Sequence, residues 1–125
     1  MSNWETTVKA VTLALDAASL KQQVIAANIA NAGVEGYSRR DVSFASQIEA
    51  ARQVLERDGV LDASLLEGMR PAVEVRTRPG GEALPVQLDQ EMVAMAENAV
   101  RYQMLVKALT RQMNLLATAA GDGKR

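Results

Sequence analysis

The stretch that decides the fold is LDQEMVAMAENAVRYQMLVKALTRQMNLLATAA, residues 88–120. Apolar side chains recur in it at alternating steps of four and three residues, which is the heptad pattern of a helix that packs along another helix. The pattern predicts one long helix over 88–120, with Asp89 as its N-cap and a short charged tail at 121–125. The members of the stripe are Leu88, Met92, Met95, Ala99, Tyr102, Val106, Leu109, Met113, Leu116 and Ala120.

A second heptad stripe lies near the N-terminus and predicts a helix over 1–33. Ser2 followed by Glu5 offers a capping box for its start, and Gly33 is a natural terminator. Two such helices in one chain favour a mainly α fold, in which they pair as an antiparallel coiled-coil hairpin within a single domain, 1–125. The N-terminal stripe consists of Val8, Val11, Leu15, Ala18, Gln22, Ile25, Ile29 and Ala32.

Both helices carry apolar residues beyond these stripes. A helix that is apolar on more than one face needs more than one neighbour, so pairing the two helices would leave a second stripe on each exposed unless other chains cover it. Association with other chains and a monomeric hairpin both stay open on this evidence. The additional residues are Val93, Val100, Met104 and Leu115 near the C-terminus, and Leu13, Leu20 and Val24 near the N-terminus.

The middle of the chain, 34–87, differs in kind because it holds all three prolines and several glycines. We expect a turn-rich and partly disordered segment that is too short to bury a core of its own. Residues 42–55 favour a short helix. The alternating stretch AVEVRT, 72–77, predicts a short strand, and RPGG, 78–81, predicts the turn that follows it.

Composition excludes several classes of function. The chain has no cysteine and no histidine, which rules out disulfides and thiolate or imidazole metal sites. Its net charge is −1 with scattered basic residues, so we expect no nucleic-acid partner. No apolar run is long enough to cross a bilayer. The N-terminus lacks the pattern of a cleaved secretory signal, and we therefore expect a cytoplasmic protein or one exported without such cleavage.

No constellation in the sequence indicates catalysis. The acidic pairs fit helix starts and helix surfaces better than a general acid and base. RPGGEALP, 78–85, has no Lys-Ser/Thr pair and is not a phosphate-binding loop. We expect no catalytic, cofactor or metal site and no small-molecule substrate.

The turn after the first predicted helix carries a family signature. AANIANAGVEGYSRRDVSFASQI, 26–48, resembles the N-terminal motif of the flagellar axial proteins of rod and hook. Val34 and Glu35 stand where that family usually has Thr-Pro. In the C-terminal stretch, Asp89, Glu91, Met92, Glu97, Asn98, Arg101, Tyr102 and Gln103 resemble the terminal helix of proximal-rod members. The matching turn residues are Asn28, Ile29, Ala30, Asn31, Gly36 and Tyr37.

The resemblance implies a structural protein without catalytic activity. Such proteins pack through their terminal helices into the hollow axial shaft of the basal body, which transmits torque and lines part of the export channel. The resemblance also implies export by the flagellar type III apparatus without a cleaved signal. Its partners would be copies of itself and other rod proteins, the membrane-supramembrane ring with its rod adaptor, and the export gate. Another short rod protein, or a cytoplasmic coiled-coil adaptor or export chaperone, is the alternative.

Three groups of residues are therefore assigned provisional roles. The amides of Asn28 and Asn31 are predicted to hydrogen-bond the chain as it turns at 33–37, and on a further hypothesis a neighbouring subunit. Phe44 and Ile48 resemble a short element that early flagellar substrates present to the export gate, although two core residues one helical turn apart would look the same. The predicted helix-packing interface consists of Val8, Val11, Leu15, Ile25, Ile29, Met92, Met95, Tyr102, Val106, Leu109, Met113 and Leu116.

Overall fold

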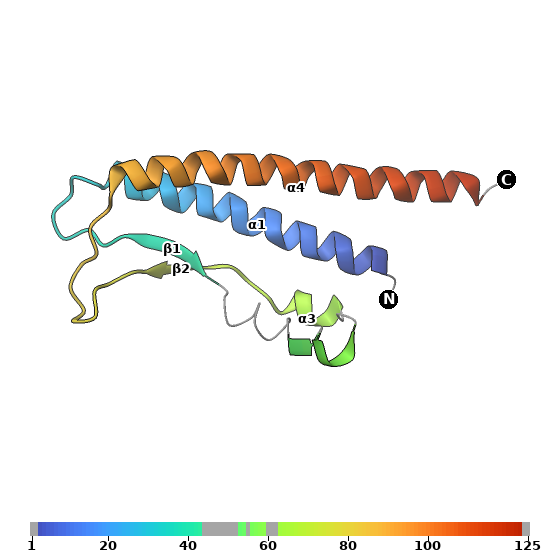
Figure 1. The fold of residues 1–125 in the computed structure, drawn as a ribbon, viewed down its shortest axis with the longest axis horizontal. Coiled ribbons are helices and arrows are strands. Elements are labelled where there is room, and N and C mark those ends of the chain that lie inside the picture. The colour runs from blue at the N-terminus through green and yellow to red at the C-terminus, as the bar shows by residue number, and fades with distance from the viewer. Residues whose placement is uncertain (1–2, 44–52, 55, 60–62, 124–125) are drawn as a thin grey trace.

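The computed structural model describes residues 3–43, 53–54, 56–59 and 63–123. Two long helices dominate it: α1 spans Asn3–Ala30 and α4 spans Leu88–Asp122. They run antiparallel and side by side, as Figure 1 shows, with the end of α1 next to the start of α4. The predicted mainly α fold with a helical hairpin is confirmed.

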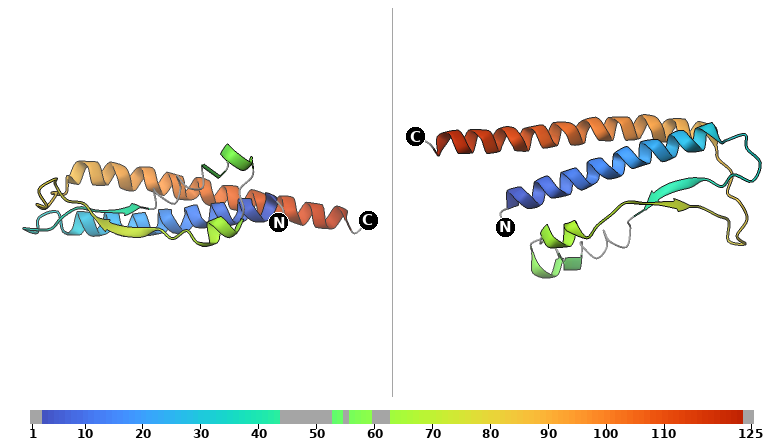
Figure 2. Two further views of the ribbon diagram at one scale, coloured as in Figure 1. Left: turned by 90° about the horizontal axis from the view of Figure 1, so that it is seen from below. Right: turned by 180° about the vertical axis from the view of Figure 1, so that it is seen from behind.

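The helices lie closest at the end where α1 finishes and α4 begins, and they separate toward the N-terminus (Figures 1 and 2). The buried apolar side chains of α1 are Ala18, Val24 and Ile25. Residues of α4 beyond Gln112 are exposed up to Gly123. The chain therefore buries only one part of α4 against its own N-terminal helix.

Two short strands form an antiparallel pair beside α1. β1 spans Arg40–Ser43 and β2 spans Ala72–Val75, with Arg40 opposite Val75 and Ser43 opposite Ala72. A tight turn follows β2, where Gly81 N donates to Arg78 O over 2.8 Å. The strand and turn predicted in 72–81 are confirmed.

A short helix, α3, spans Ala63–Glu67 and packs on the N-terminal half of α1. Leu66 and Met69 are buried there. Lys9 of α1 forms an ion pair with Glu67. α3 therefore anchors the part of the middle segment that precedes β2 on α1.

Four predicted bounds differ from the structure. The helix expected over 42–55 does not begin at Val42, because Val42 and Ser43 belong to β1. Residues 53–54 are helical, and residues 44–52 and 55 lie outside the described residues. The N-cap of α4 is Gln87, without a side-chain hydrogen bond, so Asp89 lies in the first turn. There its negative charge favours the helix N-terminus.

The third correction concerns the end of α1, which falls at Ala30 and not at Gly33. Gly33 does not have a positive φ, and the left-handed glycine of this turn is Gly36, with φ of 80°. The expected capping box includes Ser2, which lies outside the described residues. The C-terminal helix continues to Asp122, past the predicted boundary at 120, and is capped at Gly123.

Candidate functional site

Five polar residues meet at the base of the hairpin, where α1 ends and α4 begins. We call Asn28, Tyr37, Arg39, Arg40 and Glu91 the hairpin-base cluster. They come from the last turns of α1, from the turn and strand that follow it, and from the first turn of α4. The cluster thus joins three segments that are distant in sequence.

Asn28 is the centre of the cluster and is completely buried. Its Oδ1 accepts hydrogen bonds from the Arg40 backbone N–H and the Tyr37 hydroxyl, each over 3.0 Å. Its Nδ2 donates to the Arg40 carbonyl over 2.8 Å and to Glu91 Oε2 over 3.3 Å. An amide has both a donor and an acceptor group, so one Asn side chain can pair with both backbone groups of Arg40, as a neighbouring strand would.

Glu91 carries a carboxylate that is only 2% exposed. Burying a charge is costly unless a partner compensates it. Arg39 Nε donates to Glu91 Oε1 over 2.7 Å, and this guanidinium also lies 3.6 Å from Asp41. The backbone of Arg39 is fixed as well, because its N–H donates to Leu84 O over 2.8 Å. The ion pair therefore ties the start of α4 to the chain leaving the turn.

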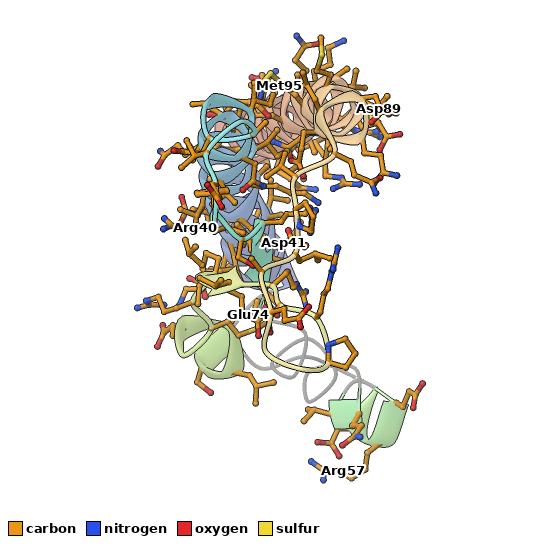
Figure 3. All side chains as sticks on the ribbon, turned by 90° about the vertical axis from the view of Figure 1, so that its left-hand side faces the viewer. Arg40, Asp41, Arg57, Glu74, Asp89 and Met95 are labelled. Carbon is orange, nitrogen blue, oxygen red and sulfur yellow. The ribbon has the colours of Figure 1, made fainter. Side chains whose placement is uncertain are left out.

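The turn between α1 and β1 is stabilised by its own contacts. The guanidinium of Arg40 lies 5.5 Å from the centre of the Tyr37 ring, a cation–π distance. Figure 3 labels Arg40, the first residue of β1. Asn31 does not reach the returning chain: its Nδ2 donates to Ala27 O over 2.8 Å, within the end of α1. Of the two predicted amide contacts, Asn28 alone bonds the returning segment within the described residues.

Asn98 makes a second buried polar contact between the helices, one heptad beyond Glu91. Its Nδ2 donates to the Ala18 carbonyl and to Gln22 Oε1, both over 2.8 Å. Its Oδ1 is buried and has no hydrogen-bond partner among the described residues. The largest fully buried side chains in the described ranges are Glu91, Asn28 and Asn98, so polar side chains are buried at this end of the hairpin beside the apolar Val24 and Ile25.

The predicted helix-packing residues divide into two groups. On α1, Ile25 is buried and its predicted neighbours are half-buried, namely Val8, Val11, Leu15 and Ile29. On α4, Met95 and Leu109 are half-buried. The other predicted α4 residues are exposed, from 40% for Leu116 to 60% for Met92, with Tyr102, Val106 and Met113 between them.

The reason is a rotation of α4. Glu91 and Asn98 turn toward α1, and each precedes a residue of the predicted stripe by one position, which is about 100° around a helix. Polar partners on α1 and in the turn select this face. Packing of the exposed stripe residues against α1 is therefore not seen, although the sequence predicted that this stripe would pair the two helices.

Of the family positions outside the cluster, Ile29 is half-buried, while Ala30 and Gly36 are exposed. Phe44 and Ile48 lie outside the described residues. Sequence reasoning missed the ion pair of Arg39 with Glu91 and the buried contact of Asn98. The heptad spacing of Glu91 and Asn98 was the one available signal, because two polar residues at that spacing share a helix face.

The hydrogen bonds of the cluster hold the backbone of the chain that leaves α1. Its described hydrogen bonds join one side chain to another or to the main chain. Within the described ranges, no group of three or more acidic side chains is placed to hold a metal ion. No helix in those ranges is both long and apolar enough to span a membrane.

Away from the cluster, a hydrogen bond to Asp58 and the charge of that carboxylate raise the pKa of Arg57, which leaves the arginine protonated.

Comparisons with known proteins place these residues in a family. The family described as "Flagella basal body rod protein" matches residues 12–37, which include Asn28 and Tyr37. Flagellar basal body rod protein FlgB of Escherichia coli is 32% identical, with 88% of this chain and 89% of that protein aligned. FlgB of Bacillus subtilis is 29% identical over 99% of this chain and 100% of its own length. With a relative this similar along most of both sequences, the chain belongs to the FlgB family of flagellar basal body rod proteins, structural components of the basal body.

Proposed function

We propose that this chain is a subunit of the proximal rod, which assembles through its terminal helices into the hollow axial shaft, transmits torque and lines part of the export channel. The whole chain, 1–125, acts as one rod-core domain. In this assembly the hairpin-base cluster fixes the angle between α1, α4 and the strand pair, and the helix faces make the contacts between subunits.

The observation that carries this proposal is the exposed apolar surface of α4. A free soluble protein rarely leaves a large continuous apolar surface in water, so such a surface marks a contact. Because its residues run from Leu88 to Leu116, this surface extends along about 42 Å of helix. Its exposed large apolar residues are Leu88, Met92, Val93, Val100, Tyr102, Met104, Val106, Met113, Leu115 and Leu116.

The proposal includes partners that follow from a place at the base of the rod. These are other rod proteins, the membrane-supramembrane ring with its rod adaptor, and the flagellar type III export gate. Export occurs without removal of a signal peptide, and Phe44 with Ile48 is the candidate element read by the gate. Neither a nucleic acid nor a small-molecule substrate takes part.

Deletion of the gene tests this function. We expect cells without the chain to stop swimming, and their isolated basal bodies to show rings without rod or hook in electron micrographs. Expression of the intact chain from a plasmid should restore both rods and swimming, which excludes an effect on neighbouring genes. Normal flagella in the deletion strain would contradict the proposal and would favour an adaptor or export chaperone.

A further inference from the structure

A groove with a basic rim lies where α1, α4 and the strand pair meet. It has a volume of about 410 Å³. Ala14, Ala17, Lys21, Val42, Asn98 and Arg101 are among its lining residues, and we call it the basic groove. In the end-on view of Figure 3, α4 lies beside α1 and the strand pair lies below it.

The floor of the basic groove admits close approach by another chain. Ala14 and Ala17 present only methyl groups, and small side chains let a helix backbone come near. The charged residues of the lining are all cations. Arg76 at the rim already lies 3.6 Å from Glu74 and 3.9 Å from Asp41. Lys21 and Arg101 are in no ion pair within the part of the chain that is described.

A ridge of opposite charge runs along the outer face of α4. Asp89, Val93, Glu97 and Val100 follow one another at steps of four, four and three residues, which places them on one helix face. All four are exposed, and we call them the acidic ridge. Figure 3 shows Asp89 on the side of α4 that points away from α1. The two carboxylates are in no ion pair within the described residues.

We propose that the acidic ridge of one copy docks into the basic groove of the next copy. Val93 and Val100 would cover the alanine floor, while Asp89 and Glu97 would face Lys21 and Arg101. Complementary charges of this kind fix orientation and register more than they add affinity. The inference rests on the proposed function, because it names the faces through which the rod subunits meet.

The partner that fits the basic groove is a second copy of this chain. The same sequence carries both complementary surfaces, and each has unpaired charges of the sign that the other needs. Because ridge and groove are different faces, the contact is heterologous. Heterologous contacts repeat from copy to copy and produce rings or open helical arrays.

Disulfide trapping tests the contact in assembled basal bodies. Because the chain has no native cysteine, every disulfide that it forms must involve an introduced cysteine. We would express the full chain with Val93→Cys and Ala17→Cys in the deletion strain and oxidise isolated basal bodies. The expected product is a covalent dimer and longer ladder of this chain. Val93→Cys with Ala10→Cys is the matched control, because Ala10 is exposed on α1 and is not among the groove residues.

A charge exchange gives an independent readout. Lys21→Glu alone and Asp89→Lys alone should each lower the amount of chain in basal bodies about tenfold, since like charges then face one another. The double variant should restore it, because each contact again joins opposite charges. Lys21→Glu with Glu35→Lys is the control of equal net charge and should not restore it.

The outcomes separate the two proposals. The chain could be present in basal bodies while no disulfide links its copies and the double variant restores nothing. That result would overturn this contact, and the proposed rod function would stand. A disulfide to a different rod protein would overturn the choice of a second copy. Absence of the unmodified chain from basal bodies would overturn the proposed function itself.

Discussion

Arg39 and Glu91 lie 52 positions apart in the sequence, and Arg39 Nε donates to Glu91 Oε1 over 2.7 Å. The carboxylate is 2% exposed and the guanidinium 31%. The pair closes the base of the hairpin, because one partner begins α4 and the other lies between the turn and β1.

Glu91→Gln should lower the free energy of unfolding by about 2 kcal/mol, because it removes the charge that compensates Arg39 while water still reaches that guanidinium. Urea denaturation of the purified chain measures this. Glu97→Gln is the matched control on the same helix, and it should change the stability by less than about 0.5 kcal/mol. Equal effects of the two substitutions would show that the buried ion pair does not stabilise the hairpin.

Asn28→Asp should lower the free energy of unfolding by about 3 kcal/mol relative to the unmodified protein. Asn28→Ala should lower it by less. The new carboxylate cannot donate to the Arg40 carbonyl, and it stands where the amide now lies 3.3 Å from Glu91 Oε2. Thermal unfolding followed by circular dichroism measures the order. If the aspartate variant melted with the unmodified chain, the amide network would not be a source of stability.

Asn31→Ala provides the contrast at the second family asparagine. We expect a loss of less than about 1 kcal/mol, because its amide donates to Ala27 O, which also accepts from the Asn31 backbone N–H. Motility of this variant tests the intersubunit hypothesis for Asn31. Normal swimming would contradict that hypothesis, whereas loss of rods from a folded chain would support it.

Gly36→Ala should cost about 1 kcal/mol, because a side chain is strained at a φ of 80°. Gly33→Ala is the control three residues earlier, where φ is not positive and an added Cβ meets nothing within 4 Å. That change should be neutral or slightly stabilising, since alanine restricts the unfolded chain. The reverse order in urea midpoints would show that Gly36 is not the constrained glycine of this turn.

The hairpin could be predicted because heptad spacing is a local property of each helix. The face that α4 turns toward α1 could not, since apolar periodicity assigns the interior to residues such as Met92 and Val106. The interior instead holds Glu91 and Asn98, whose hydrogen-bond partners on α1 are 63 to 80 positions away. A buried polar residue is stable only where such distant partners exist, and no pattern within one helix contains them.

The strand pair shows the same limit. AVEV alternates and was predicted as a strand, whereas its partner RDVS has one large apolar residue in four positions, and its last two residues were assigned to a helix. β1 is fixed by contacts from elsewhere in the chain, namely by Asn28, which pairs with both backbone groups of Arg40, and by β2. Its structure is therefore a consequence of the tertiary fold.

Replacing Tyr102 and Val106 by lysine separates folding from assembly. These side chains are 42% and 41% exposed, so the double variant should unfold within about 1 kcal/mol of the unmodified chain. It should nevertheless fail to enter basal bodies, because two charges would lie in the apolar surface proposed to contact neighbouring subunits. Urea denaturation and immunoblots of isolated basal bodies measure the two effects. Thr110→Lys with Asn114→Lys has the same spacing and charge on a polar part of α4, and it should assemble. Normal rods built from the Tyr102 and Val106 variant would show that this part of the helix faces solvent in the assembled rod.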